Sequence, residues 1–365
     1  MLAPRGLKLD RTATGITIVH ASKTYPEIHI RFIRWSEVMI DARTLTVLGM
    51  SAALALAGCE IDDADAEPEP SGDLPAPVIE AAGSEALPFA PGLVPAHGDV
   101  TSIVPGPGGE VVYLAMSGEP DRLSRLWEAR WDEEAEHYTE PTPLPFSRLG
   151  DTDRDPALAP SGSHLIFSSA RPGLAEPAGG FNLWVTEWQD PESEAGDDPE
   201  AGWSDPAPIP LINSPVWEGG PTLASSGSLY FASNREAPSP GKNLFVSELE
   251  NGMWVAGDPL EPPVNSSADE TDPWVSPDES FLLFASDRDG GFDIYVSFRS
   301  EVGGWLPPLP LGSEVNTSAN ETAPTMSETG EFLFFHREGE GILWIPVEHA
   351  ELEQPDETAD LEDGG

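Results

Sequence analysis

One short β-unit recurs along most of this chain, and that repetition limits the possible folds more than any other feature does. The clearest copy is DETDPWVSPDESFLLFASDRDGGFDIYVSF, residues 269–298. It contains three apolar runs, which begin near Trp274, Phe281 and Ile294 and are separated by turns rich in Ser, Pro, Asp and Gly. Such runs between turn residues predict three short strands per unit.

Four further copies follow the same order of runs and turns. They begin at Ile103, Pro156, Pro221 and Pro324. The equivalent turn residues of the five units are Gly109, Gly162, Gly227, Glu279 and Gly330, at spacings of 53, 65, 52 and 51 residues. A period of about 50 residues with several strands per unit is typical of a β-propeller blade and not of a helical solenoid.

A proline-rich segment follows the third strand of four units. The four segments are Tyr138 with PTPLPF, Trp203 with PAPIPLI, Trp254 with PLEPPV and Trp305 with PPLPL. Because proline lacks a backbone N–H, these segments are expected to be outer edge strands. Five units need five such strands, and residues 87–93 (LPFAPGL) have the composition to supply the fifth by pairing with residues 342–347. The expected fold is all-β: a propeller of five four-stranded blades closed by an N-terminal strand, with six blades as the alternative.

The N-terminal region predicts export. Residues 45–58 (LTVLGMSAALALAG) are too few to span a bilayer but match the apolar region of a secretory signal. They lead into Leu56-Ala57-Gly58-Cys59, which resembles the lipobox of bacterial lipoproteins and implies lipidation of Cys59, the single cysteine of the chain. The resemblance also implies outer-membrane residence, because Glu60 is not the aspartate that retains many such proteins at the inner membrane. Met39 begins a segment of ordinary signal length, so residues 1–38 are interpreted as an over-extended start.

The expected domain order is a start and signal (1–58), an acidic Pro/Ala-rich tether (59–85), the propeller (86–349) and an acidic disordered tail (350–365). After residue 58 the chain has 11 basic and 60 acidic residues. Such a charge repels phosphate backbones, which excludes nucleic acid as a partner, and it leaves membrane attachment to the lipid anchor. This negative charge is compatible with a cationic partner, with binding of a divalent metal, or with a role in solubility alone.

The copy at residues 273–296 resembles the TolB-type (WD40-like) propeller repeat, P-x-x-S-P-D-G-x-x-L-x-F-x-S-x-R-x-G-x-x-D-I-Y-V, almost throughout. The resemblance extends over residues 99–347 and is weakest in the first unit. TolB carries six blades and an extra α/β domain, which this chain is not expected to have, so a role in the Tol system is not implied. The family includes envelope propellers that bind proteins or glycans without chemistry. It also includes propellers of serine peptidases, whose G-x-S-x-G motif is missing from this sequence.

A carboxylate three residues before the repeat proline recurs together with an arginine just after the second strand. The residues are Asp153, Glu218, Glu270 and Glu321 with Arg171, Arg235, Arg288 and Arg337, and Asp99 lies near the equivalent place of the first unit. The preferred interpretation is structural: each arginine ties a loop to a carboxylate of its own or the next blade. In the alternative, the carboxylates gather at one mouth of the central channel and bind a cation such as Ca²⁺.

No catalytic residue or metal site is assigned. Residues 287–293 lack the oxygen-ligand spacing of a calcium loop, and the histidines after Cys59 have no metal-ligand spacing. The expected function is that of a lipid-anchored, non-catalytic binding or scaffold module for an envelope protein or polysaccharide. The alternative is a glycan-active hydrolase using central carboxylates. Hydrolysis requires non-equivalent acids, and acids that recur by blade favour binding.

Overall fold

A computed structural model describes residues 7–12, 15–20, 85–89, 99–117, 123–172, 180–189, 202–235 and 241–352. The chain divides into two units, Met1–Glu69 and Pro70–Gly365. In the first, β1 (Leu7–Thr12) pairs antiparallel with β2 (Gly15–His20). The signal segment, Cys59 and the tether up to residue 84 lie outside the described residues, so what the sequence indicates about them stays a prediction.

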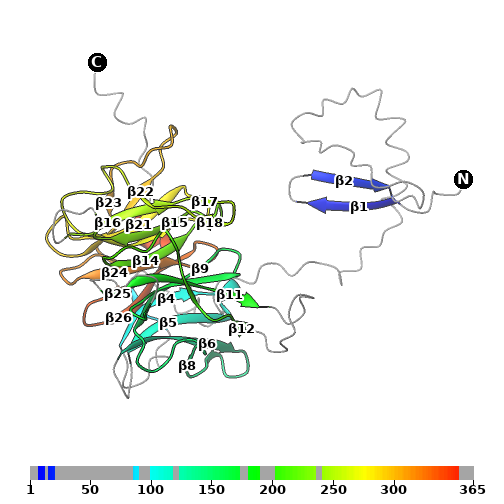
Figure 1. Cartoon of the computed structure of the whole chain (residues 1–365), viewed down its shortest axis with the longest axis horizontal. Helices are drawn as coiled ribbons and strands as arrows, with labels where there is room; N and C mark the ends of the chain where they lie inside the picture. The colour runs from blue at the N-terminus through cyan, green and yellow to red at the C-terminus, as the bar shows by residue number, and fades with distance from the viewer. Residues whose placement is uncertain are drawn as a thin grey trace, which may run out of the picture. The chain divides into compact units, whose positions relative to one another are not determined.

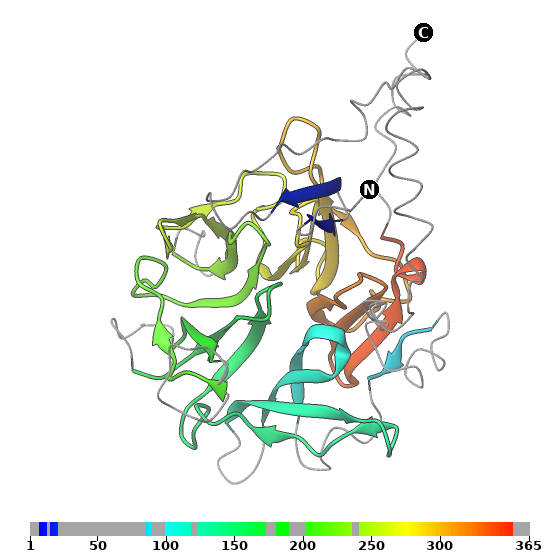
Figure 2. The ribbon, with the colours of Figure 1, turned by 90° about the vertical axis from the view of Figure 1, so that its right-hand side faces the viewer.

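The second unit contains five antiparallel sheets arranged as blades around a central axis (Figures 1 and 2). The first blade consists of β4 (Val100–Pro105), β5 (Val111–Ser117), β6 (Ser124–Asp132) and β8 (Thr142–Pro143), with β7 (His137–Tyr138) beside β6. The second consists of β9 (Asp153–Leu158), β10 (His164–Ser169), β11 (Asn182–Gln189) and β13 (Ala207–Pro208), with β12 (Gly202–Trp203) beside β11.

The third blade consists of β14 (Glu218–Leu223), β15 (Leu229–Ser233), β16 (Asn243–Ser247) and β19 (Asp258–Pro259), and carries the hairpin β17 (Leu249–Glu250) and β18 (Met253–Trp254). The fourth consists of β20 (Glu270–Val275), β21 (Phe281–Ser286), β22 (Asp293–Phe298) and β23 (Leu309–Pro310). The fifth consists of β24 (Glu321–Met326), β25 (Phe332–Arg337), β26 (Gly341–Pro346) and β3 (Leu87–Pro88). The five-bladed all-β fold predicted from the repeats is confirmed.

The hydrophobic core lies between adjacent blades, in five clusters of buried side chains. Four blades bury a phenylalanine at the same place in the second strand, and all four are 0% exposed: Phe167, Phe231, Phe284 and Phe335. Alternate residues of these central strands point to opposite faces of the sheet, and both faces are covered by neighbouring blades. The runs LIF, LYF, LLF and FLFF are therefore apolar on both faces.

The N-terminal segment closes the ring as predicted. Leu87 pairs with Trp344 and Pro88 with Leu343, and the N–H of Phe89 donates to the carbonyl oxygen of Ile342 at 3.0 Å. Residues 90–93 of the predicted closing segment lie outside the described residues. The other four outer strands each contain a proline of the predicted segments. This placement fits an edge, where a missing N–H costs no ladder hydrogen bond.

The C-terminal packing continues past residue 349, where the propeller was expected to end. After the 3-10 turn η4 (Val347–His349), Ala350 is fully buried and its carbonyl oxygen accepts the N–H of Gly312 at 3.2 Å. Leu352 packs against the same hydrophobic cluster. Residues 353–365 lie outside the described residues. Within the part of the chain that the structure describes, no helix is long and apolar enough to cross a membrane.

Each inner strand joins two faces of the disc. The arginine face carries the starts of the inner strands and the repeat arginines, including Arg288. The turn face carries the turns between first and second strands, at residues 106–110, 159–163, 224–228, 276–280 and 327–331. The two faces therefore present different chemistry.

Candidate functional site

The four repeat carboxylates begin inner strands, and each pairs with the arginine of its own blade. The nitrogen–oxygen distances are 2.6 Å for Asp153–Arg171, 3.0 Å for Glu218–Arg235, 3.2 Å for Glu270–Arg288 and 2.9 Å for Glu321–Arg337. All four carboxylates are 0% exposed. A buried carboxylate requires a paired cation and further hydrogen bonds, and the repeat supplies both in every one of these blades.

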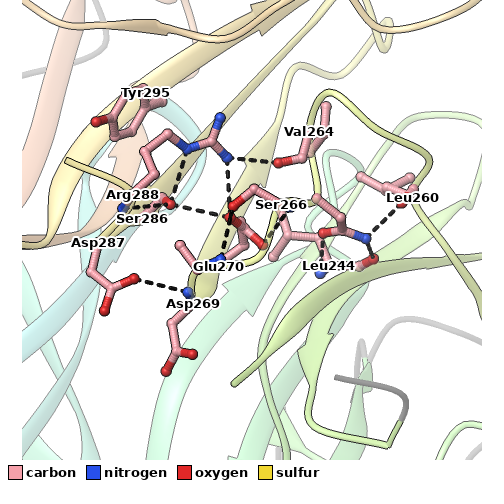
Figure 3. Close-up of polar contacts among 12 residues, drawn as sticks. Leu244, Leu260, Val264, Ser266, Asp269, Glu270, Ser286, Asp287, Arg288 and Tyr295 are labelled. Carbon is pink, nitrogen blue, oxygen red and sulfur yellow. Dashed lines mark hydrogen bonds and ion pairs between the residues drawn. The ribbon is translucent and has the colours of Figure 1, made fainter. Parts of the chain in front are cut away.

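Glu270 shows how completely such a carboxylate is satisfied (Figure 3). It accepts hydrogen bonds from Arg288 Nη2, from Ser286 Oγ at 3.2 Å, and from both the N–H and the hydroxyl of Ser266. Arg288 also donates from Nη2 to the carbonyl oxygen of Val264 at 2.7 Å and from Nε to Ser286 Oγ at 3.1 Å. The arginine therefore joins the strand end to the loop that enters the blade.

Two members of the repeat differ from the others. Arg337 was expected just after the second strand, but it is the last residue of β25 and pairs in register with Glu321. In the fourth blade, the residue that pairs in register with Glu270 is a serine, Ser286. Nε of Arg337 consequently donates to the carboxylate of Glu321. In the other three arginines, Nε donates to a serine hydroxyl and Nη2 binds the carboxylate. In the first blade, Asp99 is exposed, unlike its four buried counterparts.

The central channel is formed by all five inner strands. A cavity of about 60 Å³ lies there, and none of the four ion-paired carboxylates is among its lining residues. A second hollow of about 110 Å³ lies toward the turn face of the same channel. Ligand pockets usually have volumes of roughly 300–1,000 Å³, so each hollow fits water or a small ion better than a sugar ring. Across the described residues, no cluster of three or more His, Cys, Asp or Glu side chains could hold a metal.

Two other acids, which the sequence analysis missed, do line the channel. The residue before the repeat proline has a left-handed φ in four blades: Asp155 at 51°, Gly220 at 57°, Asp272 at 49° and Ala323 at 50°. The strand pairing shifts register at these points, so each is a β-bulge that turns a residue toward the axis. The signal that could have found the two acids is their place directly before the repeat proline.

Asp155 and Asp272 both bind the next inner strand. The Asp155 carboxylate accepts hydrogen bonds from Ser168 Oγ at 2.8 Å and from the N–H of Gly220 at 3.4 Å. The Asp272 carboxylate accepts the N–H of Ala323 at 3.3 Å. Burial, reinforced by the charge of Asp272, raises the pKa of Asp155 to about 6. The channel acids therefore link inner strands, and they also bring two like charges into one small cavity.

Among the described residues, a larger hollow lies between the second and third blades and opens on the turn face. It has a volume of about 780 Å³ and is lined chiefly by apolar residues, and we call it the turn-face groove. Three of its lining side chains are large, apolar and exposed: Leu211 at 65%, Leu249 at 42% and Met253 at 66%. A cluster of exposed apolar side chains beside a hollow is typical of a binding surface.

Comparisons with known proteins find only distant structural likenesses. No family model and no curated protein matches the chain. Among solved structures, a protein assigned as TolB from Agrobacterium tumefaciens is 13% identical at a TM-score of 0.42, covering 70% of this chain and 79% of its own. A thermostable family-43 glycoside hydrolase is 11% identical at 0.44, covering 71% and 91%. A puromycin-hydrolysing peptidase from Mycobacterium tuberculosis is 18% identical at 0.36, covering 65% of this chain and 35% of its own.

Likenesses this distant say nothing about activity. The propeller that the repeats predict is confirmed in its architecture: five blades, each with proline on its outer strand. What the protein does must therefore be argued from its own surfaces.

Proposed function

We propose that this protein is a non-catalytic binding module of the bacterial cell envelope. The observation that carries the proposal is the contrast between its hollows. The central channel holds hollows of only about 60 and 110 Å³, whereas the turn-face groove of about 780 Å³ is open and apolar. An active site needs polar groups that converge in a concave pocket. In the groove, the side chains of His164 and Glu187 lie 3.7 Å apart. Because they are 38% and 69% exposed, they do not converge inside a concave pocket.

The envelope location rests on the sequence. The apolar segment 45–58 followed by Cys59 resembles a lipoprotein signal, and lipidation of Cys59 would anchor the propeller through its tether to the outer membrane. The net charge of −46 repels anionic headgroups, so attachment depends on the lipid.

Labelling cells with an alkyne-tagged fatty acid should mark the wild-type protein and not Cys59→Ser. Equal labelling of the two proteins would contradict the anchor.

The direct test of binding is capture from the envelope in which the protein is made. The lipidated full chain is crosslinked in intact cells, extracted in mild detergent and purified, with Cys59→Ser as the unanchored control. A protein or polysaccharide enriched with the anchored chain, and not with the control, is the expected result. Recovery of nothing beyond the level of a mock purification would count against a binding function.

A glycan-active hydrolase is the second candidate, because the channel holds two acids in different surroundings. Asp155 has a pKa raised to about 6 by burial and by the charge of Asp272, as a general acid requires. The small cavity weighs against access by a sugar. Envelope polysaccharides should therefore survive incubation with the purified protein. Hydrolysis that is lost in both Asp155→Asn and Asp272→Asn would establish the hydrolase instead.

A further inference from the structure

We propose that the turn-face groove binds a protein segment in which an aromatic side chain is flanked by lysine or arginine. This inference rests on the proposed binding function and names the class of partner. It comes from a comparison of equivalent blade boundaries within the same molecule. One boundary lacks the side chains that close the next one.

The boundary between the third and fourth blades is closed on the turn face by a polar and aromatic cluster. Tyr230 Oη donates to Glu279 Oε1 at 2.6 Å and accepts from Arg299 Nη2 at 2.9 Å. The Arg299 guanidinium lies 3.9 Å from the centre of the Trp305 ring. Tyr230 packs edge-on against Trp305 with ring centres 6.4 Å apart. A tyrosine from one blade thus covers the tryptophan of the next.

The boundary between the second and third blades has different residues at the same places. Tyr230 pairs with Val246 in β15–β16, and its counterpart Ile166 pairs with Val185 in β10–β11. The positions of Glu279, Arg299 and Trp305 are taken by Gly227, Leu249 and Trp254. The phenol, the carboxylate and the guanidinium are therefore all missing here, while the tryptophan remains. The turn-face groove lies at this place and is lined by Gly227, Leu249 and Trp254.

The boundary between the first and second blades repeats the aromatic part of the closed arrangement. Tyr113 packs edge-on against Trp203 with ring centres 5.8 Å apart. On both sides of the groove, a tyrosine of the preceding blade thus contacts the corresponding tryptophan of the next. An aromatic side chain supplied by a partner would occupy the same place beside Trp254. Edge-to-face packing on an indole is a favoured aromatic geometry.

Charge selects the residues next to that aromatic anchor. On the turn face, the exposed acids Glu187, Glu248 and Glu250 flank the groove-lining strands and hairpin. The described lysines and arginines of these two blades all lie toward the arginine face: Arg154, Arg171, Arg235 and Lys242. A segment with lysine or arginine beside its aromatic residue is therefore attracted, and an acidic segment is repelled.

The test adds one of the missing side chains, the guanidinium, to the open boundary. Leu249→Arg places a guanidinium where Arg299 covers Trp305 in the next blade, and Leu249 is 42% exposed, so the folded state should tolerate the change. Val302→Arg is the matched control, because Val302 is 95% exposed in the corresponding connection of the fourth blade and adds the same charge away from the groove.

The probes are three blocked tripeptides, N-acetyl-Lys-Tyr-Lys amide, N-acetyl-Glu-Tyr-Glu amide and N-acetyl-Lys-Ala-Lys amide, with chitohexaose as a saccharide probe. Their binding to the full chain is followed by saturation-transfer NMR titration. We expect Lys-Tyr-Lys to bind at least about tenfold more tightly than the other probes, and Leu249→Arg to lose about tenfold in that affinity. Val302→Arg should bind as the wild type does.

Equal binding by wild type and Leu249→Arg, no preference for Lys-Tyr-Lys, or tighter binding of the saccharide would each overturn the assignment. The broader proposal fails separately. An envelope partner captured equally by wild type and Leu249→Arg would leave the binding function intact and exclude the groove. A chain that captures no partner would contradict the binding function, whatever the peptides show.

Discussion

Closure of the ring by residues 87–89 gives the sharpest test of the fold, through the substitution Phe89→Ala. Phe89 is 5% exposed and directly follows β3, the outer strand of the fifth blade. Its ring centre lies 5.7 Å from that of Tyr138 in the first blade and 5.2 Å from that of Phe334 in the fifth. Truncation to alanine would leave a cavity at the boundary where the two ends of the propeller meet.

The expected cost follows from this burial. Phenylalanine-to-alanine changes in protein cores reduce the free energy of unfolding by about 3–5 kcal/mol. For a domain of this size, each kcal/mol lowers Tm by about 2–4 °C, so Phe89→Ala should melt about 6–20 °C below the wild type. The stability lost at one side chain would show that the ring depends on the N-terminal strand.

Differential scanning calorimetry and size-exclusion chromatography provide the readouts. Leu309→Ala is the matched control, because Leu309 lies on the outer strand of the fourth blade and is 39% exposed. Its Tm should stay within about 2 °C of the wild type. Deletion of residues 86–94 should yield a protein that aggregates or unfolds. A Phe89→Ala protein that melts with the wild type, or a soluble deletion monomer of unchanged Tm, would refute the closure argument.

Three further predictions concern the acids. Glu270→Gln leaves the partly buried Arg288 without its counter-charge and should reduce the free energy of unfolding by about 3–5 kcal/mol in urea denaturation; a loss below about 1 kcal/mol would show that the pair contributes little. Because the pKa of Asp155 is raised to about 6, its protonation favours folding, and this contribution disappears as pH rises through that value. Asp155→Asn should therefore be more stable than the wild type at pH 8 by up to about 3 kcal/mol, with a difference that shrinks toward pH 4; a constant difference would disprove the raised pKa of Asp155. Calcium at millimolar concentration should leave Tm unchanged, and a clear rise would revive the cation hypothesis.

Much of the fold could be predicted because a blade is built from neighbouring strands. Its apolar runs, its turns and its proline-bearing outer strand all lie within about 50 consecutive residues, so local sequence signals suffice. Counting outer strands even located the closing segment, since four lay between units and a fifth was required. Leu87 and Pro88 pair with β26 as that count demands.

The site could be predicted only in part. The pairing of Glu218 with Arg235 and of Glu270 with Arg288 follows from residues that recur at fixed spacing. The shift of Arg337 has a signal in FFHR, which lacks the S-x-R spacing of the other copies, but its register with Glu321 became clear only from the paired strands. Asp155 and Asp272 turn toward the axis because of β-bulges, and these follow from how the inner strands meet.

By itself, the sequence determined the blade, the number of copies and the way in which the ring closes. Tertiary structure alone decided which boundary between blades stays open. Ile166 and Tyr230 occupy the same position of a second strand, and each faces residues of the following repeat. Whether a side chain fills a space depends on neighbours about 50 residues away, which no local pattern specifies.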